Sequence, residues 1–218
     1  MAVHEIRHPL IGDALGRLRR ADQEPAGFRA AVDQIARLLV YEATRKLPTR
    51  DLQVVGWAGP VSVQALAEPL PTLVPILRAG LGLLPGALAL LPQAAVSIVG
   101  LERNEQTLAP QAYYCKLAPA LATRPALVLD PMIATGGSLA ATLAALREAG
   151  CNELLAVALV AAPAGLERVL RAFPQVEIYV AAIDQGLNAD GYILPGLGDA
   201  GDRIFATHGA GSGLAGGG

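Results

Sequence analysis

The sequence has little cysteine, little lysine and few aromatic residues, and its cysteines and its charge argue against metal-binding, disulfide-bonded and nucleic-acid-binding proteins. Its two cysteines, Cys115 and Cys151, have no partner at metal-ligand spacing, which indicates free thiols in a reducing compartment. The net charge is −2 and the arginines are scattered through the chain, so no basic patch predicts binding to nucleic acid. Lysine is limited to Lys46 and Lys116, which leaves arginine as the main source of positive charge.

Long apolar runs are also absent. The longest are interrupted at Pro85, Pro92, Pro119 and Pro163, well short of the roughly 20 residues that a membrane-spanning helix needs. Residues 1–12 mix charged with apolar side chains and do not have the order of a signal peptide. We therefore expect a soluble, cytoplasmic protein that binds no membrane.

The chain has enough apolar residues for one sizeable core. It has 218 residues, of which 53% are hydrophobic, and this length favours a single domain. We assign that domain to residues 1–208. Residues 209–218 are nearly all glycine, alanine and serine, and we expect them to form a disordered tail.

The hydrophobic pattern predicts an α/β fold. Helical spacing at residues 11–20 and 28–47 predicts two amino-terminal helices, and residues 52–63 alternate as a hairpin does. Short β-branched runs then alternate with alanine-rich and leucine-rich stretches, which predicts a mostly parallel, twisted sheet with helices on both faces. The expected strands are 72–77, 95–101, 126–129, 154–160 and 176–182, and the expected helices are 81–91, 138–149 and 164–172. Residues 111–117 would add an antiparallel flap, and residues 184–203 a long loop.

The most informative motif begins where the strand at residues 126–129 ends. Asp130 follows that strand, and Thr135-Gly136-Gly137-Ser138 precede a predicted helix. Paired glycines let backbone N–H groups converge beside two hydroxyls at a helix N-terminus, an arrangement that binds phosphate. Without the acid, these four residues are equally compatible with a turn and a helix cap. No lysine follows the glycines and no Gly-x-Gly-x-x-Gly is present here, which argues against a nucleotide triphosphatase loop and a dinucleotide site.

Residues 127–138 resemble the ribose-phosphate loop of the type I phosphoribosyltransferases. Most of that superfamily has two successive acids after the strand, whereas Asp130-Pro131 resembles the uracil phosphoribosyltransferases. Three further segments resemble the same family: residues 74–82, residues 103–105, and residues 183–188 with 192–202. The resemblance runs from His8 to Phe205 and leaves out the glycine-rich tail.

The resemblance implies a reaction in which phosphoribosyl diphosphate (PRPP) and uracil give uridine monophosphate (UMP) and pyrophosphate. Mg²⁺ is implied as the cofactor, bound through PRPP with no direct protein ligand, because pyrophosphate leaves poorly until its charge is neutralised. Asp130 would accept hydrogen bonds from two ribose hydroxyls and favour the developing cation. The alternative for this aspartate is a cap on the next turn. The implied catalytic residues are Asp130, Asp199 and Arg103.

The implied PRPP site lies at strand ends. Arg78 and Arg103 follow the strands at 72–77 and 95–101, where a guanidinium suits bidentate contact with a phosphate group. Taken alone, either arginine is more often a solvated surface residue, and it is their shared position at strand ends that favours a functional role. The residues implied to bind PRPP are Arg78, Arg103, Asp130, Pro131, Met132, Ile133, Ala134, Thr135, Gly136, Gly137, Ser138 and Asp199.

Residues 192–200 are implied to recognise the base. Uracil has carbonyl acceptors on both sides of its N3–H, so main-chain N–H, C=O and N–H groups in register read it and reject cytosine. The residues implied to bind uracil are Tyr192, Ile193, Gly198, Asp199 and Ala200. Asp199 is also compatible with a turn-shaping role, and Tyr192 with filling the interior of the loop.

Two rival functions remain open at this stage. One is a phosphoribosyltransferase for a purine or for orotate, although orotate would need a cation and residues 192–202 contain none. The other is a regulatory nucleic-acid-binding protein on the same fold, which would need a basic face. The resemblance also implies a homodimer or larger homo-oligomer in which the hairpin reaches a neighbouring subunit, and it leaves open a GTP effector.

Overall fold

The computed structural model describes residues 2–103 and 110–207, and of Arg103 and Pro110 it describes the backbone alone. Asn104, Glu105 and the predicted tail at residues 209–218 lie outside the described residues.

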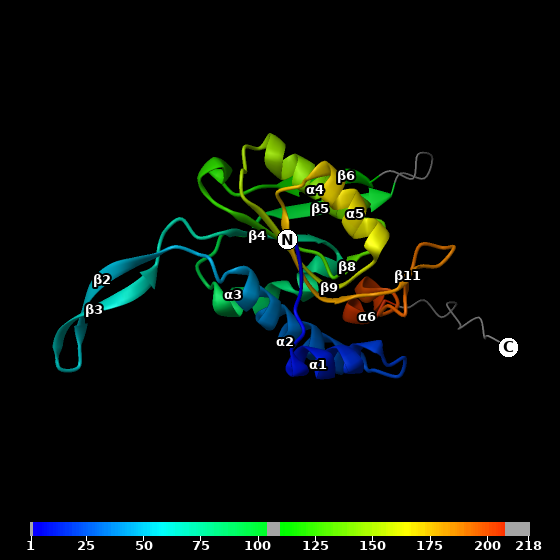
Figure 1. The fold of residues 1–218 in the computed structure, drawn as a ribbon, viewed down its shortest axis with the longest axis horizontal. Coiled ribbons are helices and arrows are strands. Elements are labelled where there is room, and N and C mark those ends of the chain that lie inside the picture. The colour runs from blue at the N-terminus through cyan, green and yellow to red at the C-terminus, as the bar shows by residue number, and fades with distance from the viewer. Residues whose placement is uncertain (1, 104–109, 208–218) are drawn as a thin grey trace.

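A sheet of eight strands forms the centre of the molecule, and all of its described pairings are parallel except that of β6 with β5 (Figure 1). Its order is β1-β10-β9-β7-β4-β5-β6, and β8 pairs with β9 beside β7. The strands are β1 (Val3–Glu5), β4 (Thr72–Leu77), β5 (Ile98–Arg103), β6 (Pro110–Lys116), β7 (Ala126–Leu129), β8 (Met132–Ile133), β9 (Leu154–Ala161) and β10 (Glu177–Ile183). The predicted α/β class, with its mostly parallel sheet, is confirmed.

Helices cover both faces of this sheet, α4 and α5 on one side and α1 to α3 on the other (Figure 1). Their bounds are α1 (Pro9–Arg19), α2 (Pro25–Ala43), α3 (Leu84–Leu90), α4 (Gly137–Glu148), α5 (Pro163–Ala172) and α6 (Ala200–Phe205), with 3₁₀ turns η1 (Ala79–Gly82) and η2 (Leu121–Thr123). In β7, Leu127 and Leu129 pack in the core beneath α1 and α2, whereas Ala126 and Val128 pack beneath α4. Because both faces are buried, the strand is a continuous apolar run.

The start of α1 is determined by a side-chain cap and a proline. The Nδ1 of His8 accepts a hydrogen bond from the N–H of Leu10 at 3.1 Å, and Pro9 takes the first helical position. α1 therefore starts two residues before the apolar pattern that predicted it. Ile11, Ala14, Leu15 and Leu18 then line one buried face of the helix.

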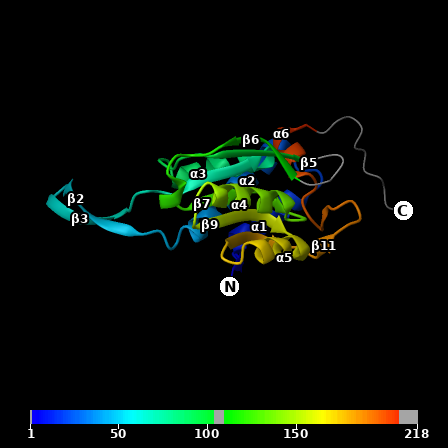
Figure 2. The same cartoon turned by 90° about the horizontal axis from the view of Figure 1, so that it is seen from above.

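The hairpin of β2 (Thr49–Gly56) and β3 (Gly59–Leu66) projects away from the sheet and helices (Figure 2). Val55 is 91% exposed and Trp57, at the tip, is 103% exposed. The predicted hairpin is confirmed, and it is longer than the alternating pattern indicated.

The expectation of one long loop at residues 184–203 is wrong in part. β11 (Gly186–Leu187) pairs with β12 (Ile193–Leu194), and α6 follows at Ala200. These elements are too short to show a period in the sequence, and Gly201 hides the helical pattern of α6. The helix expected at residues 81–91 is divided between η1 and α3, and β1 was not expected at all.

Among the residues that the structure describes, no helix combines the length and apolar character that crossing a membrane requires.

Candidate functional site

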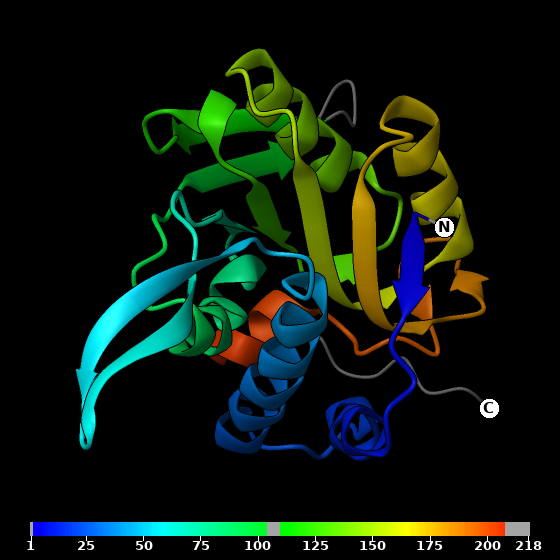
Figure 3. The same ribbon diagram turned by 60° about the vertical axis from the view of Figure 1, so that its left-hand side comes forward.

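Parallel strands of the sheet end at a common edge (Figure 3), and several of the predicted site residues lie at the ends of these strands. Arg78 directly follows β4, Asp130 follows β7, and Arg103 is the last residue of β5. β7, β4 and β5 are adjacent and parallel, so these three positions lie at the same edge of the sheet, with Arg103 three residues beyond Gly100, the partner of Leu77. Open parallel sheets bind their ligands at this edge. The side chain of Arg103 lies outside the description, so the structure gives only its place on the strand.

The predicted phosphate loop ends in a glycine turn at the start of α4. Gly136 has φ +74°, and a Cβ placed there would lie 2.5 Å from the carbonyl oxygen of Gly165 in α5. Only glycine satisfies both the left-handed backbone and this close approach. Thr135 and Ser138 are exposed beside it. The first amides of α4 have no acceptor within the helix and carry its positive dipole end, so the loop offers N–H and hydroxyl donors to an anion.

Between Asp130 and this turn, the chain is held against β9. The carbonyl of Pro131 accepts hydrogen bonds from the N–H groups of Leu159 at 3.0 Å and Val160 at 3.2 Å, and Met132 and Ile133 pair with β9 as β8. The side chain of Ile133 is in the core, at 1% exposure. Of the predicted PRPP-binding residues, Pro131, Met132 and Ile133 therefore border the site with their backbone and fix the position of the turn that follows.

Asp130 is partly buried, and this burial raises the pKa of its carboxyl to about 7. The N–H of Met132, at 3.5 Å from Oδ1, lowers the pKa by a smaller amount. A carboxylate in this environment gains from new hydrogen-bond donors, because they stabilise its ionised form. A pair of vicinal sugar hydroxyls supplies such donors.

Arg78 lies close to the end of β7. A Cβ on Gly80 would lie 2.4 Å from the carbonyl oxygen of Leu129, so the turn after β4 approaches the residue before Asp130. The peptide bond between Leu77 and Arg78 is cis. Nη2 of Arg78 lies 3.2 Å from Oδ1 of Asp202, and 58% of the arginine side chain is exposed. An exposed ion pair of this kind contributes little stability, so the guanidinium can exchange its partner for a phosphate group at small cost.

The predicted base-reading residues lie on the segment from Tyr192, directly before β12, to the start of α6. Ile193 is buried within β12, Gly198 and Asp199 are exposed, and Ala200 is the first residue of α6. Oδ1 of Asp199 accepts a hydrogen bond from the N–H of Asp202 at 2.9 Å, so Asp199 caps this helix as well as facing solvent. Tyr192 is 50% exposed, which argues against a role in filling the loop's interior.

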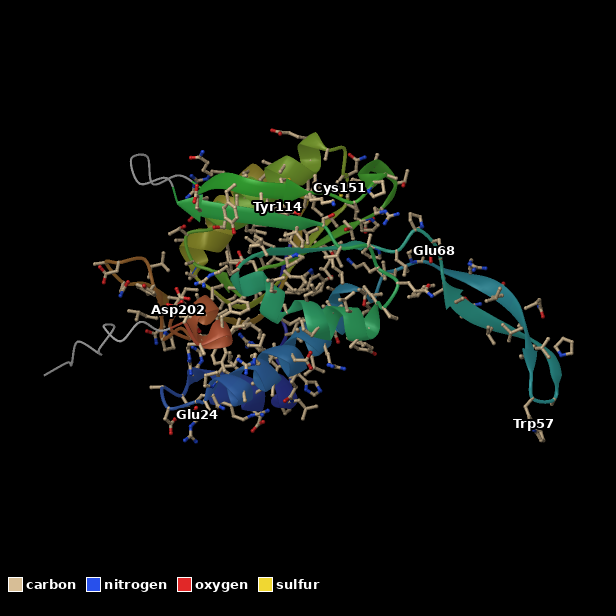
Figure 4. The ribbon with its side chains drawn as sticks, turned by 180° about the vertical axis from the view of Figure 1, so that it is seen from behind. Glu24, Trp57, Glu68, Tyr114, Cys151 and Asp202 are labelled. Atoms are coloured by element: carbon tan, nitrogen blue, oxygen red, sulfur yellow. The ribbon has the colours of Figure 1, made fainter. Side chains whose placement is uncertain are left out.

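This segment meets the Arg78 turn directly. The Cβ position of Gly201 is 3.7 Å from the Cβ of Ala79 and 4.0 Å from Nη2 of Arg78. Asp202 lies at the end of the molecule opposite the hairpin tip at Trp57 (Figure 4). The structure thus brings residues 192–202, the predicted base segment, and the Arg78 turn together at the sheet edge that also carries Asp130.

Sequence reasoning missed two arginines and undervalued one aspartate near this site. Arg19 forms a bidentate ion pair with Asp184, and Arg203 donates hydrogen bonds to the carbonyls of Leu18 and Leu197. The only signal in the sequence was the place of Asp184, two residues after the strand predicted at residues 176–182.

The described residues do not form a cluster of side chains that would hold a metal ion by itself. Across residues 2–103 and 110–207, no three acidic, histidine or cysteine side chains gather as a metal cluster. Mg²⁺ keeps several waters and binds phosphate oxygens readily. Mg²⁺ that is bound to a diphosphate therefore needs no dedicated set of protein ligands.

Comparison with known proteins agrees with this geometry. A family model described as uracil phosphoribosyltransferase matches residues 5–207. The solved AQ2163 protein of Aquifex aeolicus is 39% identical, with 94% of this chain and 98% of that chain covered and a TM-score of 0.89. The adenine phosphoribosyl transferase of Trypanosoma brucei, solved with AMP, pyrophosphate and ribose-5-phosphate, is 11% identical, with 87% of each chain covered and a TM-score of 0.58.

The fold is that of the type I phosphoribosyltransferases. Because the family model spans nearly the whole chain, the protein belongs to the uracil phosphoribosyltransferase family.

Proposed function

We propose that the protein transfers the 5-phosphoribosyl group of PRPP to N1 of uracil, giving UMP and pyrophosphate. The observation that carries this proposal is the position of the base segment at the sheet edge beside Arg78 and Asp130. The segment brings main-chain groups to this edge, and residues 192–202 contain no cationic side chain. Main-chain N–H and C=O groups can match the donor and acceptor pattern of uracil. The family match over residues 5–207 supports the same base.

PRPP binding divides among three parts of the sheet edge. The hydroxyls of Thr135 and Ser138 and the first amides of α4 bind the 5′-phosphate. Asp130 accepts hydrogen bonds from the two ribose hydroxyls, and its negative charge stabilises the ribose as it becomes cation-like. Arg78 exchanges Asp202 for the pyrophosphate, and Arg103 at the end of β5 is assigned to the same group.

The proposal includes Mg²⁺, which would bind together with PRPP. The carboxylates of Asp130 and Asp199 would accept hydrogen bonds from its water ligands, and the bound ion neutralises charge on the departing pyrophosphate. Asp199 is also the residue that we assign to the N1 proton of uracil, since it is exposed next to Gly198.

The base segment would select uracil by its hydrogen-bond pattern. The N–H groups of Gly198 and Ala200 donate to the two carbonyls that flank N3, and the carbonyl of Ile193 accepts from N3–H. Tyr192 packs against the base or the ribose. Orotate is disfavoured because the nearest cation along the chain, Arg203, donates to Leu18 and Leu197 and not toward the exposed side of the segment. A base without the N3 proton would leave a carbonyl unpaired, and such mismatches are costly.

An assay with a panel of bases tests this function. With PRPP and Mg²⁺, we expect nucleotide formation from uracil and none from cytosine, hypoxanthine or orotate. Chromatography of the products measures nucleotide formation. Equal turnover of a purine would contradict the base assignment while leaving the phosphoribosyltransferase class intact. The same assay with added GTP tests whether that nucleotide is an effector, and omission of Mg²⁺ tests the cofactor.

We also propose that the protein is a homodimer, or a larger homo-oligomer, assembled through the β2–β3 hairpin. Its apolar side chains at Val55, Trp57 and Val61 are exposed in the single chain. An aromatic side chain at the tip of an arm is a typical interface anchor.

Trp57→Asp should therefore weaken self-association by about 30-fold or more, which corresponds to the loss of one anchor of about 2 kcal/mol. Sedimentation velocity over a dilution series measures the effect. Leu10→Asp adds the same charge at another exposed apolar position, and it should leave association unchanged. A wild-type protein that sediments as a monomer at all concentrations would overturn the assembly.

A further inference from the structure

Arg203 connects the base segment to the amino-terminal helices. Its Nη1 donates to the carbonyls of Leu18 at 2.6 Å and Leu197 at 2.8 Å, and its Nη2 donates to the carbonyl of Arg20. The guanidinium carbon lies 4.3 Å from the centre of the Phe28 ring. One side chain of α6 thus holds the end of α1 and the residue that precedes Gly198.

The bond to Leu197 determines where an amide of the base segment points. In a trans peptide, the C=O of one residue and the N–H of the next point in opposite directions within one plane. The peptide between Leu197 and Gly198 is trans, since the cis bonds of the described chain are elsewhere. Because the C=O of Leu197 points to Arg203, the N–H of Gly198 points away from it, on the exposed side of the segment.

The ion pair between Arg19 and Asp184 fixes the residue before Leu197. Arg19 approaches Asp184 with Nη2 at 2.6 Å and Nη1 at 2.9 Å, and the same Nη1 donates to the carbonyl of Gly196 at 2.9 Å. Asp184 Oδ2 also accepts the N–H of Gly196 at 3.0 Å, and the aspartate side chain is only 4% exposed. The carbonyls of Gly196 and Leu197 are therefore both held by guanidinium groups.

We propose that Arg203 is a positioning residue for base recognition: by holding the carbonyl of Leu197, it directs the N–H of Gly198 at a carbonyl oxygen of the base. Arg19 and Asp184 support this role because they bind Gly196, so the residue after β10 and Gly196 are held together. The inference rests on the proposed function, because it takes uracil as the base. It predicts that Arg203 controls affinity for the base and has little effect on affinity for PRPP.

A merely structural role for Arg203 is the competing explanation. The carbonyls of Leu18 and Arg20 lie at the carboxyl end of α1, where a cation stabilises a helix by itself. Loss of such a cap would lower the melting temperature and would reduce both substrate affinities together. A test must therefore separate the two substrates and must probe the hydrogen bond itself.

Kinetics of Arg203→Met and Arg203→Lys, with uracil, 2-thiouracil and 4-thiouracil as bases, provide that test. Sulfur is a poorer acceptor than oxygen, so the wild-type protein should prefer uracil to the thio-base whose sulfur faces Gly198. In Arg203→Met, the KM for uracil should rise about 10-fold, the KM for PRPP should change less than 2-fold, and that preference should shrink. Arg203→Lys should recover part of the loss, because an ammonium can still donate to one carbonyl. If Arg203→Met melts below the assay temperature, Arg203→Lys serves as the decisive variant.

Arg29→Met is the matched control. Nη1 of Arg29 donates to the carbonyl of Ile204 at 2.9 Å, so its loss also removes an arginine bond to α6 while leaving the base segment untouched. We expect it to keep the wild-type KM for uracil and the wild-type preference for oxygen. Parallel changes in both KM values, or an unchanged preference in the Arg203 variants, would overturn the positioning role alone. A wild-type protein that does not use uracil would overturn the proposed function and this inference with it.

Discussion

Replacing Asp130 with asparagine is expected to lower kcat by on the order of 10²–10³-fold and to leave the fold intact. The amide keeps the shape of the side chain, but it removes the negative charge that would stabilise the cation-like ribose and puts a donor where an acceptor is needed. Steady-state kinetics with PRPP and uracil measure the loss, and circular dichroism checks the fold. Asp190→Asn, at an exposed acid in the turn between β11 and β12, is the control and should behave as wild type. Near-normal turnover in Asp130→Asn would reject the catalytic role.

The same substitution is expected to stabilise the free protein above neutral pH. Burial raises the pKa of Asp130 from 3.8 to about 7, so the folded state binds a proton more tightly than the unfolded state. The contribution of this tighter proton binding to the stability of the folded state is fully present below pH 4. It is lost as the pH rises toward 7, where the buried carboxyl must ionise. At pH 8, Asp130→Asn should therefore be more stable than wild type by about 1–3 kcal/mol, and the difference should shrink toward pH 4. Urea titrations at pH 5 and pH 8 measure it; equal differences at both values would contradict the raised pKa.

Gly136→Ala is expected to have the second large effect, on both stability and PRPP binding. The new Cβ would lie 2.5 Å from the carbonyl oxygen of Gly165, in a backbone at φ +74°. The loop must shift away from α5, and we expect a loss of about 2–4 kcal/mol together with a KM for PRPP at least 10-fold higher. Urea midpoints and kinetics at saturating uracil measure the two effects.

Gly191→Ala separates the steric contribution from the backbone strain. Gly191 has φ +85°, but nothing lies within 4 Å of its Cβ position. This variant should lose only about 1 kcal/mol and keep the wild-type KM for PRPP. Similar losses in the two variants would show that the contact with Gly165 does not matter.

The parts of the fold that were predictable are those where the sequence carries a local signal. Strands β4 and β7 were predicted at their observed bounds, because strands buried on both faces are continuous apolar runs that end at a polar residue. The hairpin and the glycine turn before α4 were predictable for similar local reasons. Asp130 and Arg78 could be placed at one edge because parallel strands share their carboxyl ends.

The connections to the amino-terminal helices could not be predicted in this way. Arg19 and Asp184 are 165 residues apart in sequence, and Arg203 and Leu18 are 185 residues apart. No periodicity or spacing links such pairs, so these arginines resembled ordinary surface residues. β1 has three residues and is ordered by pairing with β10, and α6 is ordered by its cap and its contacts with η1. Short elements that depend on tertiary partners give no pattern of their own.

If the proposed assembly forms, the hairpin of β2 and β3 also makes the protein sensitive to its own dilution. Two strands with most of both faces in water hold their shape poorly by themselves, and this pair has almost no other element against it. If a neighbouring copy supplies the missing surface, dissociation and local unfolding of the ribbon are one event. Arg50, in β2, would then become a point where trypsin cuts dilute samples faster than concentrated ones.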